Sequence, residues 1–132
     1  MSDESAVEMR LPESVREKAS VYLGEWAWRT ADVPEAIEAA AGVGLAVVLG
    51  DPRVMLPQGP YELPAPTVDE DDEDLQRPGE SWGAFVERSA HEARQALERL
   101  LRDRSWLAGE PNAPRDLLDL EWVLYFLTPT GR

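Results

Sequence analysis

Cysteine is absent from this sequence of 132 residues, and histidine and lysine occur only once each. Without cysteine the chain has no thiol nucleophile, no cysteine-ligated zinc site and no disulfide framework. His91 has no second histidine with which to hold a metal, and the sequence contains no phosphate-binding loop or serine nucleophile elbow. We therefore expect no catalytic residue, no metal and no cofactor, so that the protein is not an enzyme.

Long apolar runs are also missing. The first residues, Met1 to Ser5, are acidic and lack the apolar core of a signal peptide. No stretch approaches the roughly 18 apolar residues that a membrane span requires. We expect a cytoplasmic protein that does not enter the membrane.

Negative charge, by contrast, is abundant. The chain has 26 acidic and 13 basic residues, which gives a formal charge of −13. This sign disfavours direct binding to nucleic acid, because phosphates need cationic partners. It would speed association with a basic protein, although acidic composition also serves solubility alone. The charge count alone leaves both interpretations open, a basic protein partner and solubility.

Two apolar runs, residues 45–49 and 120–127, have the character of buried strands. The first is closed by Gly50 and Pro52, and the second ends just before Pro129. We expect the two strands to lie side by side in the middle of one sheet. The alternation in residues 25–29 predicts a further strand with both tryptophans on one face.

The longest predicted helix covers residues 82–104 and is capped by Ser81. Its apolar stripe repeats at helical spacing, and His91 lies opposite the stripe on the surface. Ser89 falls within the stripe, where we expect its hydroxyl to bond the carbonyl four residues back. The stripe consists of Trp82, Phe85, Val86, Ser89, Ala93, Ala96, Leu97 and Leu100.

Two shorter helices are predicted nearer the N-terminus. One begins at Leu11-Pro12 and continues to Leu23, with Val15, Ala19 and Tyr22 on one face. The other covers residues 33–41 and is preceded by Asp32, which with Glu35 has the spacing of a capping box.

Together these elements predict an α+β fold. We expect a single small domain, with a three- to four-stranded sheet packed by one long and two short helices. Residues 1–10 are expected to fray. Residues 57–80 are expected to form a Pro-rich and acidic loop, and residues 53–56 at most an edge strand, because proline cannot donate to a β-ladder.

Six consecutive acids interrupt this loop, and they are Asp69, Glu70, Asp71, Asp72, Glu73 and Asp74. We call these residues the acidic run. Their spacing partly matches a calcium-binding loop, but Asp74 stands where the sharp turn of that loop needs glycine. The run is therefore expected to be either a plain solvated loop or a contact surface for a basic protein.

The order of features from Trp26 to Phe126 resembles the immunity protein 40 family of bacterial polymorphic toxin systems. The resemblance is carried by residues 25–28, by residues 47–51 with their Gly50-Asp51 pair, by Trp82 with residues 85–89, and by the aromatic C-terminal strand. It departs from the family at Leu49, where a glycine is usual, and at the acidic run, which replaces an aromatic-rich segment.

The resemblance implies an α+β inhibitor that binds the toxic domain of a secreted effector by occlusion and without catalysis. A nuclease toxin, which is often basic, would suit the charge of this chain. We expect the acidic run and Glu80 to form the charged contact, with Asp51 and Arg53 as a weaker neighbouring patch.

Two other classes stay open. An inhibitor from a mobile element that mimics nucleic acid and blocks a host nuclease would spread its acids over a surface at phosphate-like spacing. An enzyme that uses carboxylates alone would need buried acids, and Glu121 is the one acid within an apolar strand.

Overall fold

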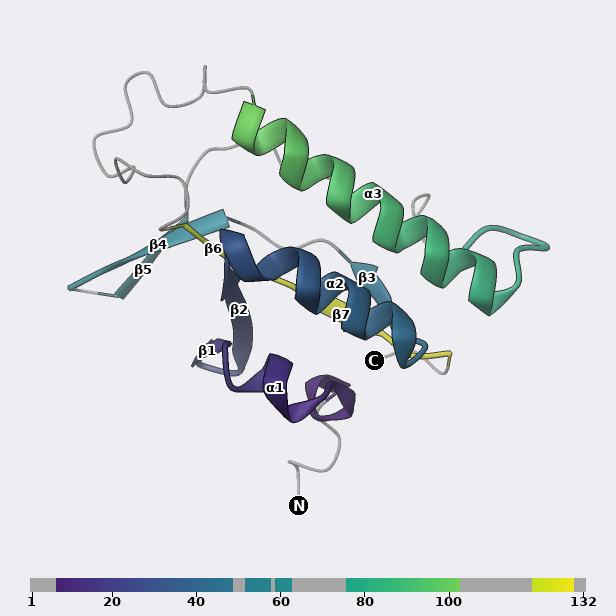
Figure 1. The fold of residues 1–132 in the computed structure, drawn as a ribbon, viewed down its shortest axis with the longest axis horizontal. Helices are drawn as coiled ribbons and strands as arrows, with labels where there is room; N and C mark the ends of the chain where they lie inside the picture. Colours follow the sequence, from purple (N-terminus) through teal and green to yellow (C-terminus); the bar gives the residue numbers. More distant parts are fainter. Residues whose placement is uncertain (1–6, 49–51, 58, 63–75, 103–119, 130–132) are drawn as a thin grey trace.

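The computed structural model describes residues 7–48, 52–57, 59–62, 76–102 and 120–129. They form an α+β domain, as predicted, with two sheets behind the helices (Figure 1). The helices are α1 (Glu13–Arg16), α2 (Val33–Gly42) and α3 (Trp82–Arg102). The strands are β1 (Ser20–Tyr22), β2 (Glu25–Arg29), β3 (Ala46–Val48), β4 (Pro52–Leu56), β5 (Gly59–Glu62), β6 (Glu121–Val123) and β7 (Tyr125–Leu127).

The larger sheet has the strand order β1-β2-β6-β4-β5, and β3 pairs with β7 in a second sheet. The pairings described are all antiparallel. The C-terminal apolar run, predicted as one strand, is divided at Leu124, whose N–H donates to the carbonyl of Trp26 at 3.1 Å. The two apolar runs are therefore neighbours, as predicted, but they share the second sheet through β3 and β7.

The long helix confirms its predicted stripe. The residues from Phe85 to Leu100 in that stripe are buried, Trp82 is partly buried, and the Ser81 hydroxyl accepts the N–H of Ala84 at 3.1 Å. Ser89 is buried too, but its hydroxyl donates to the carbonyl of Val86, three residues back instead of four. The same oxygen accepts the N–H of Val47 at 3.1 Å, so α3 covers the free edge of β3.

The first predicted helix is wrong beyond Arg16. The chain leaves α1 and forms strand β1, which turns back into β2 through Leu23 and Gly24 with φ of 52° and 82°. Pairing with β2 outweighs the helical spacing of the apolar residues, since strand formers such as Val21 and Tyr22 suit a sheet. Residues 7–10, expected to fray, form a 3₁₀ turn with Val7 buried.

Two further details differ from expectation. A 3₁₀ turn at Thr30–Asp32 leaves Asp32 without a side-chain capping bond, and Glu35 instead pairs with Lys18 at 2.7 Å. Strand β4 is not an edge strand, because it lies between β6 and β5. Pro52 stands at its first residue, and β5 takes the edge position, so the prolines break no central ladder.

Aromatic rings from the two sheets meet in the core. Trp28 and Trp122 are opposite one another on β2 and β6, and each is 1% exposed. Trp28 packs edge-on against Phe126 and donates from Nε1 to the carbonyl of Val15, which fixes α1 to the sheet. The buried position predicted for Trp122 is confirmed. Helices α2 and α3 lie alongside one another across this core (Figure 1).

Candidate interaction surface

The residues predicted to contact a partner fall into three places. Asp51 and the acidic run lie outside the described residues. Arg53 lies on β4, and Glu80 precedes α3. The structure therefore describes two of the predicted contact residues, and each of them belongs to a separate network of ion pairs.

Arg53 is buried within the larger sheet. Its side chain is 2% exposed, and it contacts Glu121 of β6 and Glu25 of β2, each at 3.3 Å. Arg53 and Glu121 are direct cross-strand partners, so the strand register brings them together. The hydroxyl of Tyr125 donates to Glu25 at 2.9 Å, which extends the network to β7.

This position corrects the expectation for Arg53. A side chain with so little exposed area is not a surface contact for a docking protein, and its charge is compensated by Glu25 and Glu121. Its Nη2 atom is buried and has no hydrogen-bond partner among the residues that the structure describes. An arginine in the interior needs such compensation because an unpaired buried charge is costly. Arg53 therefore connects strands.

Sequence reasoning missed Glu25 and Tyr125 as members of this network. Glu121 was noticed as the one acid in an apolar strand, and its side chain is indeed only 15% exposed. Its carboxylate is held by Arg53, which is the arrangement of a structural ion pair. The only signal for the network was the placement of charges on the strand faces opposite the tryptophans.

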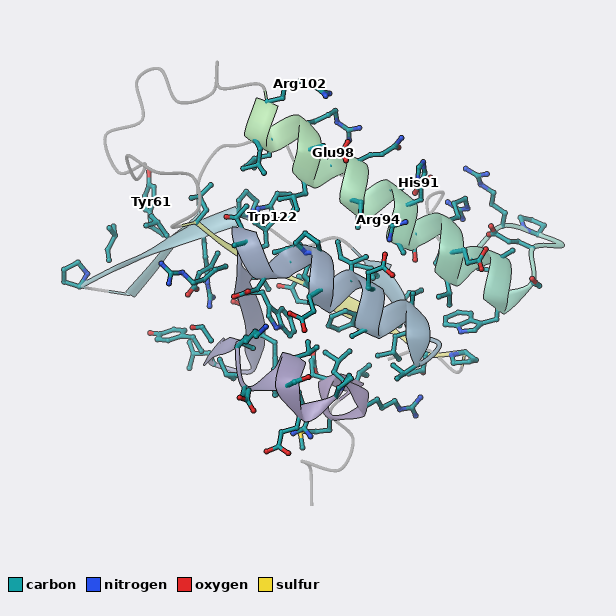
Figure 2. The ribbon with its side chains drawn as sticks, viewed as in Figure 1. Tyr61, His91, Arg94, Glu98, Arg102 and Trp122 are labelled. Carbon is teal, nitrogen blue, oxygen red and sulfur yellow. The ribbon has the colours of Figure 1, made fainter. Side chains whose placement is uncertain are left out.

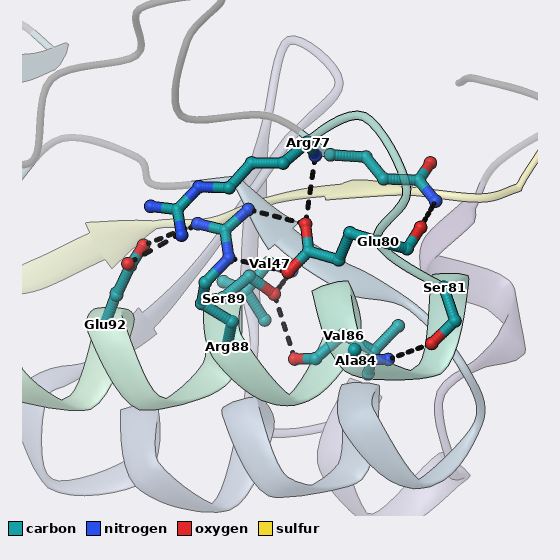
Figure 3. A network of polar contacts seen from close by, with 10 residues as sticks. Val47, Arg77, Glu80, Ser81, Ala84, Val86, Arg88, Ser89 and Glu92 are labelled. Atoms are coloured by element: carbon teal, nitrogen blue, oxygen red, sulfur yellow. Dashed lines mark hydrogen bonds and ion pairs between the residues drawn. The ribbon is translucent and has the colours of Figure 1, made fainter.

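Glu80 belongs to a second network, at the start of α3 (Figure 3). Its two carboxylate oxygens accept Nε and Nη2 of Arg88 at 2.8 and 2.9 Å, and Oε1 also accepts the N–H of Arg77. Arg88 reaches Glu92 at 3.4 Å and stacks over the ring of Phe85 at 5.3 Å. We call the Glu80–Arg88 pair the clasp.

The clasp changes the acidity of Glu80. Hydrogen bonds from the Arg88 guanidinium and from the Arg77 N–H lower the pKa of Glu80 from 4.5 to about 2. The same contact raises the pKa of Arg88. Glu80 is thus ionised at neutral pH, but its charge is committed to Arg88.

The remaining negative charge is unevenly divided along the chain. The described residues contain 13 of the 26 acids and ten of the 13 bases, so their formal charge is −3. The other residues account for −10, and the acidic run alone carries −6 of that. The described fold is therefore close to charge balance, and the excess is concentrated next to it in sequence.

His91 lies exposed on the outer side of α3, as predicted, where Figure 2 also shows Glu98 and Arg102. Within the described ranges, no three histidine, aspartate or glutamate side chains gather as a metal site. No helix in the same ranges has the length and apolar character of a membrane span.

Comparisons with models of protein families, with curated proteins and with solved structures found no match to this chain.

Proposed function

We propose that this chain is an immunity-type inhibitor that binds a basic toxin domain and blocks it by occlusion, without catalysis, in the cytoplasm. The observation that carries the proposal is the division of charge. A nearly balanced fold carries a formal charge of −3, and six consecutive acids add −6 in a single short run.

Ion pairs inside the fold consume much of the charge of its glutamates. Among the described residues, carboxylates besides that of Glu80 also lie within 4 Å of a lysine or arginine, including Glu25, Glu35, Glu38, Glu92 and Glu121. A mimic of nucleic acid would instead need free acids spread at phosphate-like spacing. The pairing therefore favours one concentrated contact over a distributed one.

A concentrated charged contact mainly raises the rate of association with the partner. Complementary charges raise the encounter rate of two proteins by roughly 10 to 10³-fold, and salt weakens the effect because the Debye length is about 8 Å at physiological ionic strength. Faster association is most useful to an inhibitor that must reach its toxin before the toxin reaches a cellular target.

The test begins with the toxin domain encoded beside this gene, or with the protein captured from the native host. Replacing the acidic run with Asn and Gln should slow association at least about tenfold at low salt, and the difference should shrink as salt rises. The matched control removes six other acids, Asp3, Glu4, Glu13, Glu87, Glu98 and Glu110. Equal association rates for the acidic-run variant and the unmodified protein would contradict the proposal.

Inhibition by occlusion also predicts that the histidine is dispensable. His91→Gln should protect cells against the toxin as well as the unmodified protein does, because occlusion needs no proton transfer. Survival of cells that express the toxin with either form measures this. A loss of protection in a folded variant would mean that chemistry contributes.

A further inference from the structure

Three consecutive apolar residues are exposed where β1 turns into β2. Val21 is 53% exposed, Tyr22 is 38% exposed and Leu23 is 87% exposed. Single exposed apolar residues are common on protein surfaces, but adjacent ones at the tip of a hairpin form a patch. We call residues 21–23 the hairpin tip.

Leu23 also has an unfavourable backbone. Its φ of 52° lies in the left-handed region, which Gly, Asn and Asp adopt most readily in two-residue hairpin turns. A bulky leucine there is uncommon, and its exposed side chain gains little from the fold in return. Backbone strain of this kind is often found at functional positions. Exposure and strain at the same residue indicate that the side chain is presented for another molecule.

The hairpin tip is also held in place. Strand β1 pairs with β2 along its length, and the hydroxyl of Tyr22 lies 3.6 Å from the position of a Cβ on Gly59 of β5. Strands β1 and β5 are the two edges of the larger sheet, so the Tyr22 side chain lies near the opposite edge strand. A rigid tip loses less conformational freedom on binding than a mobile one.

Charge selects the kind of partner. Exposed Glu17 and Lys18 precede the hairpin, and Glu25 beyond the turn is paired with Arg53, so the relevant charge is that of the whole chain. A second copy of this chain would bring another net charge of −13 against the first, and an anionic membrane surface would repel it similarly. A basic protein would instead be attracted by the net negative charge of the chain.

We infer that the hairpin tip is the apolar anchor of the complex, with Leu23 entering a pocket on a basic protein partner. The partner's identity rests on the proposed function, but the anchor itself does not depend on the acidic run. Full burial of a leucine side chain should tighten the complex by roughly tenfold or more in Kd.

The first measurement is photo-crosslinking in the native host with a photoreactive amino acid at position 23 or at position 9. Met9 is 50% exposed on a different element and is the matched control. The expected result is a covalent adduct from position 23 with one basic protein, identified by mass spectrometry, and no such adduct from position 9. An adduct with lipid, with a second copy of this chain or with nothing overturns the inference.

The second measurement uses Leu23→Asn with the purified crosslinked protein, and Met9→Gln as its control. Asn suits the left-handed turn, so the variant should fold at least as well as the unmodified protein. Its complex should dissociate about tenfold faster or more at every salt concentration, whereas the acidic-run variant should change association at low salt. Unchanged dissociation of Leu23→Asn overturns the anchor, and unchanged association of the acidic-run variant overturns only the proposed charged contact.

Discussion

Arg53 and Arg88 each hold two carboxylates, but they do so in opposite ways. Arg53 gathers glutamates that are 28 and 68 residues away, through single contacts of 3.3 Å, on a side chain that is 2% exposed. Arg88 gathers glutamates only eight and four residues away, with two short bonds to Glu80, and is 16% exposed. Buried long-range pairs connect strands, whereas short local pairs arrange the junction where α3 begins.

The two arginines therefore differ both in the geometry of their hydrogen bonds and in their exposure to water. The clasp has the shorter hydrogen bonds, but the Arg88 guanidinium is more exposed to water than that of Arg53, and water screens part of its attraction. The pairs of Arg53 are longer and leave Nη2 without a hydrogen-bond partner within the described ranges, but they lie where an uncompensated charge is most costly. We therefore expect the sheet around β6 to determine global stability and the clasp to determine only local order.

The largest expected effect is at Trp122, beside Glu121 on β6. Trp122→Ala should lower the free energy of unfolding by about 3–5 kcal/mol, since it removes a fully buried ring from the hydrophobic core. Chemical denaturation measures the change. A loss below about 1 kcal/mol would mean that β6 does not lie in the centre of the core.

The next effect concerns Arg53 itself. Arg53→Ala should cost about 3 kcal/mol, because it leaves the largely buried carboxylate of Glu121 without its cation. The double variant Arg53→Leu with Glu121→Leu should recover to within about 1 kcal/mol of the unmodified protein, since no uncompensated charge then remains. If the double variant is as unstable as the single one, side-chain packing and not the uncompensated charge explains the loss of stability.

The same distinction between local and long-range contacts explains which features could be predicted from the sequence. The stripe of α3 and its Ser81 cap depend on residues within one or two turns, so spacing alone indicated them correctly. The spacing of Val15, Ala19 and Tyr22 misled, because β1 forms by pairing with β2 and through the left-handed turn at Leu23. Arg53 was placed on the surface because its partners are distant in sequence, and only the strand register brings them to it.

A smaller effect is expected at Ser89, where α3 covers β3. Ser89→Ala should cost about 1–2 kcal/mol, because the N–H of Val47 loses its buried acceptor. Hydrogen exchange of the Val47 amide should quicken with the loss of stability, which distinguishes this cause from a general loosening. Ala90→Ser, at the neighbouring buried position of the helix, controls for the change of one hydroxyl.

The smallest effect, at the clasp, depends on pH. The pKa of Glu80 is about 2 in the fold against an ordinary 4.5, so the clasp stabilises fully above about pH 4.5 and is lost as the pH falls toward 2. Glu80→Gln should therefore be less stable than the unmodified protein at pH 7, by less than Arg53→Ala, and the two denaturation midpoints should converge between pH 4.5 and 2. Glu87→Gln, at an exposed position of the same helix, controls for the loss of one negative charge. A gap that stays constant over this range would show that the ionised carboxylate of Glu80 does not stabilise the fold, and the contrast between the two arginines would then weaken.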